Sequence, residues 1–387
     1  MRSTWPRERS ELSGLDWLRS LFASYYARAE VVLPEDYAAR EWAFQPLGSS
    51  TYIRHLSFKT EAELRRYLVR NPPAHAYYSS ARFLFPEVPY MEQKVWLGSD
   101  LIFDIDADHL PGCENPKTRW ACSSCGRSFE VEGRGKSIAC PACGSRELID
   151  LSEVSPECLK LAARETAKLL RVLENDFGVD DVHVYFSGNR GFHVHVTSKE
   201  LLELNGDERR ELVDYLKGVG LELREVLELG GEAKRPRSSA VAPSPRDAGW
   251  RGRLGRVIYD ELGLSDDKVL TFGELKGRDL EELIPKASVH VDEKVTIDVH
   301  RLVRLPGSLN GKTGMPVVEV RPRELEAFSL TCSLSPFDGT AAVALSVDLD
   351  VEVFDVEIHG ERGELVELPL CAAVFLALRG AVERVVA

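Results

Sequence analysis

Two acidic residues stand one residue apart in the segment Phe103-Asp104-Ile105-Asp106. Successive side chains of a strand point to opposite faces, so Asp104 and Asp106 would share one face while Phe103 and Ile105 point into the core. Two like charges at this spacing repel each other. A divalent cation such as Mg²⁺ or Mn²⁺, which prefers oxygen ligands, would relieve that repulsion. The alternative for an isolated Asp-x-Asp pair is a solvated strand end, which is the commoner case.

A further carboxylate lies in residues 295–300, where apolar and polar residues alternate as in a strand. This pattern predicts that Asp298 points outward, away from the core. Arg301 and Arg304 follow within six residues. A carboxylate close to two arginines fits a site for a metal ion and a phosphate group. A surface aspartate paired with an arginine is the plainer alternative.

The segment Ser187-Gly188-Asn189-Arg190-Gly191 lies between two strand-like stretches. Its two glycines flank a short turn. In such a turn, backbone N–H groups, the Ser187 hydroxyl and the Arg190 guanidinium can converge on an anion. His193 begins the next strand and could donate to the same anion. The alternative is an ordinary β-turn with an incidental arginine. We interpret His195, on the same strand face as His193, as structural.

The segment from Arg304 to Gly314 contains Gly311-Lys312-Thr313, which resembles part of a P-loop. A P-loop needs a glycine five residues before Gly311, where this chain has Pro306, and a helix after it, where this chain looks strand-like. We therefore reject the interpretation of this segment as the P-loop of an ATPase. A basic loop that presents Lys312 to phosphate remains the interpretation.

Four cysteines form two Cys-x-x-Cys-Gly motifs, Cys122 with Cys125 and Cys140 with Cys143. Four thiolates at this spacing are typical of a closed, structural Zn²⁺ site. Cys113 is left as a free thiol or an alternative zinc ligand. The remaining three cysteines are predicted to be small, isolated core residues: Cys158, Cys332 and Cys371.

The chain has 387 residues, a net charge of −13 and no apolar run of membrane-spanning length. Its first residues carry charges and lack the apolar core of a signal peptide, so secretion and a membrane span are not expected. The scarcity of amides, with six Asn and two Gln, hints at a thermophile. Residues 231–256 hold seven basic and two acidic side chains. We expect that stretch to contact nucleic acid, with a solvated loop as the alternative.

The predicted elements must position these groups. Helices are expected to begin at Ser10, Thr60 and Ser155, the last ending at Gly178. Strands are expected over residues 95–106, 182–186 and 192–196, with the last two joined as a hairpin. Residues 199–290 are mostly helical in pattern, and the chain ends in an alternating acidic stretch and an apolar helix. Interleaved strands and helices predict an α/β or α+β fold.

In order, these segments resemble the small, catalytic subunit of the archaeal and eukaryotic type of DNA primase. The resemblance spans roughly residues 35–320 and rests on these segments: Arg40-Glu41-Trp42-Ala43-Phe44, Tyr52-Ile53-Arg54-His55, Phe103-Asp104-Ile105-Asp106-Ala107-Asp108, Ser187-Gly188-Asn189-Arg190-Gly191-Phe192-His193, Asp298 with Arg301 and Arg304, and Leu305-Pro306-Gly307-Ser308-Leu309 with Lys312-Thr313-Gly314.

The resemblance implies a role for each site residue. Asp104, Asp106 and Asp298 would be catalytic carboxylates that hold two Mg²⁺ or Mn²⁺ ions. The triphosphate of the incoming nucleotide would be bound by the following residues: Ser187, Arg190 and His193, with Arg304 and Lys312. Tyr52 and Arg54 match further nucleotide-binding positions.

The chain departs from the family pattern in two places. Asn310 stands where the family usually has histidine, so an amide would have to replace a possible charge there. The family's zinc ligands usually lie closer together, and Cys113, Cys122 and Cys125 match that region. Here Cys140 and Cys143 extend it into a ribbon, so we expect Cys122, Cys125, Cys140 and Cys143 to bind zinc, with Cys113 as the rival ligand.

The resemblance implies a compact primase-type α/β core with a zinc-ribbon insert and a helical subdomain. The expected division is a core of residues 1–110, 151–198 and 291–330, an insert of 111–150, a helical subdomain of 199–290 with the basic loop, and an acidic C-terminal segment of 331–387.

The expected function is template-directed synthesis of short primers on single-stranded DNA from nucleoside triphosphates. The expected partner is the primase large subunit in a heterodimer, and the expected location is the cytoplasm of an archaeon, at the nucleoid. The alternatives are a primer-extending repair polymerase of the same superfamily, or a non-catalytic zinc-ribbon scaffold that binds DNA.

Overall fold

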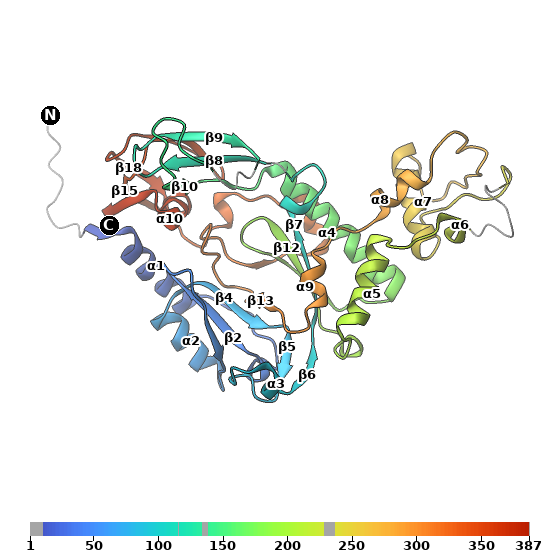
Figure 1. Cartoon of the computed structure of the whole chain (residues 1–387), viewed down its shortest axis with the longest axis horizontal. Helices are drawn as coiled ribbons and strands as arrows, with labels where there is room; N and C mark the ends of the chain where they lie inside the picture. The colour runs from blue at the N-terminus through green and yellow to red at the C-terminus, as the bar shows by residue number, and fades with distance from the viewer. Residues whose placement is uncertain (1–10, 115, 134–137, 228–236, 387) are drawn as a thin grey trace.

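The computed structural model describes residues 11–114, 116–133, 138–227 and 237–386 (Figure 1). The strand that carries Asp104 and Asp106 lies in a central antiparallel sheet. The sheet has the order β14 (Val318–Glu319), β11 (Val182–Phe186), β12 (Gly191–Val196) and β7 (Leu101–Asp106). The predicted hairpin is confirmed, since β11 pairs with β12 in antiparallel register. The strand predicted over residues 95–106 is instead two strands, β6 (Trp96–Ser99) and β7, separated by Asp100.

Helix α4 (Pro156–Phe177) covers the inner face of this sheet. It begins as predicted, because the Ser155 hydroxyl caps the backbone N–H of Cys158, and it ends at Gly178 in the left-handed conformation. Leu169 and Leu173 of α4 are buried against Phe103 of β7 and Phe192 of β12, among other apolar side chains. The apolar face of the sheet is therefore fixed, and Asp104 and Asp106 point to the opposite face.

A second antiparallel sheet provides the other wall of the site. Its order is β13 (Leu302–Arg304), β4 (Pro73–Ser79), β2 (Trp42–Pro46) and β3 (Ile53–Leu56). Helices α1 (Gly14–Arg28) and α2 (Glu61–Arg70) bury Phe22 and Leu64 against Trp42. The predicted start of α2 at Thr60 is confirmed by its side-chain cap. Helix α1 begins at Gly14 after a Ser13 cap, and Ser10 lies outside the described residues.

Beyond the central sheet, the described part of residues 199–290 holds helices joined by loops, here called the helical region, on the right of Figure 1. Its helices are α5 (Gly206–Lys217), α6 (Leu223–Val226), α7 (Gly249–Leu262) and α8 (Ile284–Ala287), and α9 (Glu293–Ile297) then leads back to the central sheet. Trp250, Leu254 and Tyr259 form a small core of their own here. The strand predicted over residues 295–300 is wrong, because the chain forms α9 and then a turn.

The cysteine-rich insert forms a three-stranded sheet in the order β10 (Leu148–Asp150), β8 (Lys117–Cys122) and β9 (Ser128–Glu132). It lies beside the C-terminal part of the chain (Figure 1). There, a sheet in the order β1 (Glu11–Ser13), β19 (Val382–Val386), β15 (Thr340–Leu345) and β18 (Leu365–Pro369) joins the two ends of the described chain. The predicted apolar helix is α10 (Leu370–Arg379), and β19 follows it.

The remaining elements are short. Two hairpins are formed by β5 (Ala81–Phe83) with β6, and by β16 (Leu349–Val353) with β17 (Val356–Gly360). One further α-helix, α3 (Met91–Lys94), precedes β6. Among the described residues, no helix is both long and apolar enough to cross a membrane.

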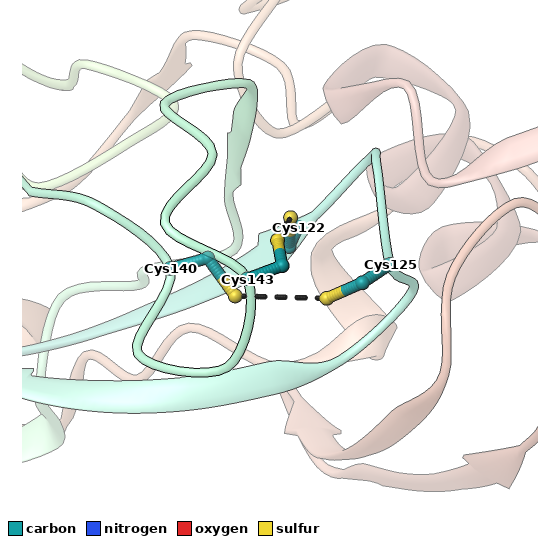
Figure 2. A group of neighbouring side chains, drawn as sticks. All are labelled: Cys122, Cys125, Cys140 and Cys143. Atoms are coloured by element: carbon teal, nitrogen blue, oxygen red, sulfur yellow. Dashed lines mark hydrogen bonds between the residues drawn. The ribbon is translucent and has the colours of Figure 1, made fainter.

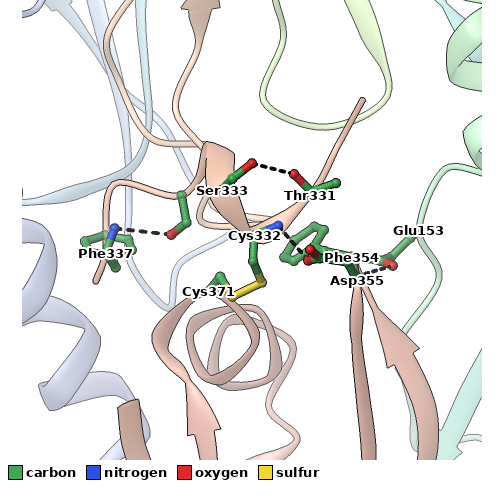
Figure 3. The surroundings of a disulfide bond; sticks show 9 residues. Glu153, Thr331, Cys332, Ser333, Phe337, Phe354, Asp355 and Cys371 are labelled. Carbon is green, nitrogen blue, oxygen red and sulfur yellow. Dashed lines mark hydrogen bonds between the residues drawn. A yellow bond between two sulfur atoms is a disulfide. The ribbon is translucent and has the colours of Figure 1, made fainter. Parts of the chain in front are cut away.

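Two disulfides link cysteines that the sequence placed in other roles. Cys113 is bonded to Cys158. Cys332 is bonded to Cys371 (Figure 3). The prediction that Cys158, Cys332 and Cys371 are isolated core residues is therefore wrong. The partners lie 45 and 39 residues apart, and sequence alone does not reveal which cysteines pair. The first bond ties the start of the insert to α4, and the second ties residues 332–334 to α10.

Candidate active site and zinc-binding site

Asp104 and Asp106 lie on one face of β7, as alternation predicts. In the register with β12, Asp104 is opposite His193 and Asp106 is opposite Gly191. The His193 Nε2 atom lies 3.6 Å from Asp104 Oδ1. A Cβ atom at Gly191 would lie 2.3 Å from the Ile105 carbonyl oxygen and 2.7 Å from Asp106 Oδ1. Glycine at this position is therefore what lets the turn approach the carboxylates.

A third carboxylate, Asp292, reaches the same place from the start of α9. Its backbone N–H donates to the Asp104 carbonyl oxygen at 2.9 Å. One of its carboxylate oxygens caps α9 by accepting from the Lys294 N–H. A cavity of 350 Å³ is lined by Asp104, Asp106 and Asp292 together. Sequence reasoning missed Asp292, although an aspartate directly before a short helix is a usual capping signal.

Asp298 lies at the opposite end of the same helix. It is the residue that follows α9, and its carboxylate accepts from the His300 backbone N–H. Its charge acts on Arg209: burial lowers the pKa of Arg209, and the charges of Asp100 and Asp298 partly oppose this. Asp298 lines neither of the two cavities that contain Asp104 and Asp106. The expectation for Asp298 depended on the alternation of a strand. The structure has the short helix α9 there instead of a strand, so the Asp298 side chain does not reach the cavities of Asp104 and Asp106.

The environment of Asp104 fits a metal ligand. Burial, followed by the charges of Asp106 and Asp292, raises the pKa of Asp104 to about 8. Among the described residues, no donor lies within hydrogen-bonding distance of its buried Oδ1 atom, since His193 Nε2 stays 3.6 Å away. A divalent cation would neutralise the three carboxylates and supply a partner for this oxygen. The donor set of oxygen atoms suits Mg²⁺ or Mn²⁺.

The turn between β11 and β12 forms the cationic side of the site. Arg190 places its Nη1 atom 2.7 Å from Asp108 Oδ2 and its Nε atom 3.5 Å from Asp106 Oδ2. Gly188 has a φ of +76°, and a Cβ atom there would lie 2.8 Å from Asn310 Cβ. Burial, and then the charge of Arg304, lowers the pKa of His193 to about 4. His193 is thus a neutral imidazole that faces Asp104.

The loop after β13 holds this turn in place. The Asn310 amide is fully buried and donates to the Ser187 carbonyl oxygen at 2.9 Å. The hydroxyl of Thr313 donates to the Gly188 carbonyl oxygen. Asn310 Oδ1 also accepts from the Lys312 backbone N–H at 3.0 Å. Asn310, which stands where the family has histidine, therefore connects the two loops. Its NH₂ group and its carbonyl oxygen both already have hydrogen-bond partners.

Arg304 is held by β4 of the second sheet. Its Nη1 atom donates to His75 Nδ1 at 2.7 Å, and its guanidinium lies 5.2 Å from the centre of the Tyr77 ring. The Gly311 backbone N–H also donates to His75 Nδ1. Burial, and then the charges of Arg304 and Lys312, lowers the pKa of His75, so the ring stays neutral and accepts both bonds. His75 and Tyr77 gave no signal in the sequence.

Most of the predicted site residues meet in one cavity. A volume of 190 Å³ between the two sheets is lined by seven of them, together with Arg301, Tyr77 and other residues: Asp104, Asp106, Ser187, Arg190, His193, Arg304 and Lys312. Tyr52 and Arg54 do not line it. The Tyr52 ring lies 5.8 Å from that of Tyr77, and Arg54 forms an ion pair with the buried Glu41.

The basic stretch of residues 231–256 is only partly described, and Lys234 and Arg235 lie outside the described residues. Arg253 is buried, donates to the carbonyl oxygens of Leu216 and Ala287, and lies 3.8 Å from the Trp250 ring centre. Arg251 and Arg256 form ion pairs with Asp247 and Asp266. For Arg253, the expected contact with nucleic acid is therefore replaced by a role in packing.

The four cysteines of the ribbon converge (Figure 2). Sγ of Cys122 lies 3.6 Å from that of Cys143, and Sγ of Cys125 lies 3.6 Å from that of Cys140. All four sulfur atoms lie within 4.8 Å of one another. Sulfurs bound to one zinc at about 2.3 Å would stand about 3.8 Å apart in a tetrahedron. The arrangement therefore fits Zn²⁺, and Cys113 is not available as a ligand because it is in a disulfide.

Comparison with known proteins agrees with this geometry. The family described as DNA primase small subunit matches residues 149–322. A curated DNA primase small subunit from Saccharolobus islandicus (strain L.S.2.15 / Lassen #1) is 38% identical over 364 residues, which are 94% of this chain and 93% of the relative. The corresponding protein of Archaeoglobus fulgidus is 36% identical over 94% of this chain and 97% of its own length. The chain therefore belongs to the DNA primase small subunit family.

Proposed function

We propose that this chain is the catalytic subunit of a DNA primase and synthesises short primers on single-stranded DNA from nucleoside triphosphates. Membership of the family supports this function. The observation that carries it is the meeting of Asp104 and Asp106 with a cationic wall in one cavity, while Asp292 joins the same two carboxylates in the adjoining cavity. Such a pairing suits phosphoryl transfer, in which metal ions and cations stabilise the charge of the transferred group.

The proposed carboxylate set is Asp104, Asp106 and Asp292, and Asp292 takes the place first given to Asp298. These residues would hold one or two divalent cations, which supply Lewis-acid activation of the primer hydroxyl and charge neutralisation at the phosphates. The raised pKa of Asp104 and its unsatisfied oxygen support metal binding at this position.

The residues across the cavity would bind the triphosphate. Arg190 and Lys312 provide charge, the Ser187 hydroxyl and neutral His193 provide hydrogen bonds, and Arg304 is already oriented by His75. Arg190 would exchange its ion pairs with Asp106 and Asp108 for phosphate oxygens when a nucleotide binds. Its carboxylate partners would then be free for the metal.

Tyr52 and Arg54 are proposed to act at the edge of the nucleotide site. Tyr52 is half exposed beside Tyr77, which lines the cavity, so its ring can contact the sugar or the base. Arg54 is fixed by Glu41 and would reach the nucleotide only by leaving that ion pair.

The zinc proposed for the four-cysteine group is structural. Four thiolates leave no position open for substrate or water. The insert also carries few apolar residues, so the metal would supply the stability that its small sheet lacks.

The proposed partner is the large subunit, since the matched relatives are named small subunits. The test is to incubate the chain with unprimed single-stranded DNA, nucleotides and Mg²⁺ or Mn²⁺, with and without that partner. New products that begin with a 5′-triphosphate support primer synthesis. Extension of an added primer without any synthesis on unprimed template would instead identify a primer-extending polymerase.

A further inference from the structure

A second, larger cavity adjoins the nucleotide cavity. It has a volume of 480 Å³ and lies between the insert and the core. The insert contributes Lys117, Thr118 and Trp120 from β8 and Asp150 from β10. The segment before α4 contributes Glu153, and α10 contributes Arg379. The cavity therefore exists only because the insert, α4 and the C-terminal helix meet.

The two cavities share a wall. Asn189, Arg190 and Lys312 line both of them. The phosphate groups that Arg190 and Lys312 would hold in the nucleotide cavity are thus within reach of the second cavity. The cavity of 350 Å³ adjoins the nucleotide cavity at a different place, through Asp104 and Asp106.

The electrostatics of the second cavity favour an anion. Lys312 is partly buried, and burial, followed by the charges of Arg190, Arg304 and Arg379, lowers its pKa. Two of the three carboxylates in the wall are already paired, Asp108 with Arg190 and Asp150 with Arg379. Lys312 remains to face a ligand, and Lys117 has only a long, solvent-exposed ion pair with Glu132 at 3.9 Å.

The third carboxylate, Glu153, is only partly ionised near neutral pH. Burial raises the pKa of Glu153 to about 7, and its oxygens accept from the Phe354 backbone N–H (Figure 3). The first turn of α4, whose cap residue Ser155 lines the cavity, adds the positive end of a helix of 22 residues. The cationic groups therefore outweigh the ionised, unpaired acidic ones.

Arg379 connects the segments that form this wall. Its Nε atom donates to the Lys312 carbonyl oxygen at 2.9 Å, and Nη1 donates to that of Asp150 at 3.1 Å. Its Nη2 atom donates to the Ser152 carbonyl oxygen at 3.3 Å, and the guanidinium lies 5.0 Å from the Phe375 ring centre. The position of Lys312 between the two cavities is thus built into the fold.

We propose that the second cavity binds the inorganic pyrophosphate released at each nucleotide addition. This inference rests on the proposed function. In that reaction the primer 3′-oxygen forms a bond to the α-phosphorus, and its proton passes to solvent. The bond from the α-phosphorus to the bridging oxygen breaks, and pyrophosphate leaves with the electron pair. The leaving group departs on the side opposite the attacking oxygen, which is the side of Arg190 and Lys312.

Lys117 provides the test, because it lines the second cavity and not the nucleotide cavity. It is exposed, and its ammonium lies 3.9 Å from the exposed Glu132, so Lys117→Glu should leave the fold intact. The matched control is Lys276→Glu, an exposed lysine of the helical region that lines neither cavity. Zinc content and thermal unfolding verify that both variants are folded.

The measurements are the inhibition constant of added pyrophosphate during primer extension and the KM for nucleotide. Lys117→Glu should raise the inhibition constant by about fivefold, the effect expected of reversing one partly solvated charge. The KM for nucleotide should stay within about twofold, and Lys276→Glu should change neither value. An unchanged inhibition constant, or an equal rise of both constants, would overturn the proposal.

Direct titration separates this proposal from the proposed function. Pyrophosphate is added to the full chain with Mg²⁺, in the absence of DNA, and its affinity is compared between wild type and the two variants. Weaker binding only in Lys117→Glu supports the cavity even if the chain makes no primers. Equal binding by all three proteins contradicts the cavity even if primer synthesis is normal.

Discussion

The backbone N–H of Asp292 donates to the carbonyl oxygen of Asp104, and this single bond joins α9 to β7 at the centre of the candidate site. It places the start of α9 beside the Asp-x-Asp face and brings a third carboxylate there across 188 residues of sequence. Charge repulsion within this group is part of what raises the pKa of Asp104. The three carboxylates therefore repel one another, and a divalent cation bound between them would remove this repulsion.

The zinc site makes a specific prediction about its ligands. Cys140→Ser should lose bound zinc and loosen the insert, because a tetrahedral site depends on all four thiolates. Cys113→Ser should keep its zinc, since Cys113 is bonded to Cys158. Metal analysis of the two purified variants decides this. Loss of zinc in Cys113→Ser with retention in Cys140→Ser would mean that the more compact family pattern holds.

Arg379 should act on nucleotide binding through the position of Lys312. Arg379→Lys keeps the charge but cannot span the carbonyl oxygens of Lys312, Asp150 and Ser152. We expect the KM for nucleotide to rise by about tenfold with a smaller change in kcat, because the binding loop is displaced and the carboxylates are not.

The control for Arg379 is Arg384→Lys, whose exposed ion pair with Glu11 lies away from the site. It should leave both kinetic constants unchanged. A fall in kcat at constant KM in Arg379→Lys would contradict the positioning role.

Glu153 should make the stability of the protein depend on pH. Its pKa is raised from 4.5 to about 7, mainly by burial. Below pH 4.5 it is neutral in both the folded and the unfolded state. As pH rises from 4.5 to 7, the unfolded state ionises first, so stability is lost, by about 3 kcal/mol at most.

Glu153→Gln removes this ionisation and keeps an oxygen for the Phe354 N–H. The variant should gain stability relative to wild type between pH 5 and pH 8, measured by urea unfolding at both values. A difference in unfolding free energy that does not change with pH would show that Glu153 is ionised in the folded protein.

The basic stretch now divides into structural and exposed arginines. Arg253→Ala should destabilise the helical region by about 2–4 kcal/mol, because the buried Ala287 carbonyl oxygen loses both guanidinium donors and the Trp250 ring loses its packing partner. Arg256→Ala removes only an exposed ion pair and should be nearly neutral for stability. Thermal unfolding of the two variants checks this. Equal, small effects would show that Arg253 is not a packing residue.

Local patterns in the sequence predicted much of the fold. Capping residues marked the starts of α2 and α4, and Gly178 marked the end of α4. Alternation marked β7, β11 and β12. These signals act between residues that are close in sequence. The paired Cys-x-x-Cys-Gly motifs likewise predicted a group of four sulfurs that the structure brings together.

The failures involve short elements and long-range contacts. Residues 295–300 alternate like a strand, but Asp292 caps a helix there and the contact with β7 favours it. The disulfide partners and the neutral His75 beneath Arg304 depend on chain segments that are distant in sequence. Periodicity carries no information about such pairs.

The most direct test of the account compares Asp292→Asn with Asp298→Asn in primer synthesis. Asparagine keeps the side-chain oxygen that caps α9 in the first case and accepts from His300 in the second. Asp292→Asn should reduce the rate of nucleotide addition by about 100-fold or more, because it removes a metal-binding charge. Asp298→Asn should retain nearly full activity. Loss of activity in Asp298→Asn with normal activity in Asp292→Asn would contradict the proposed carboxylate site.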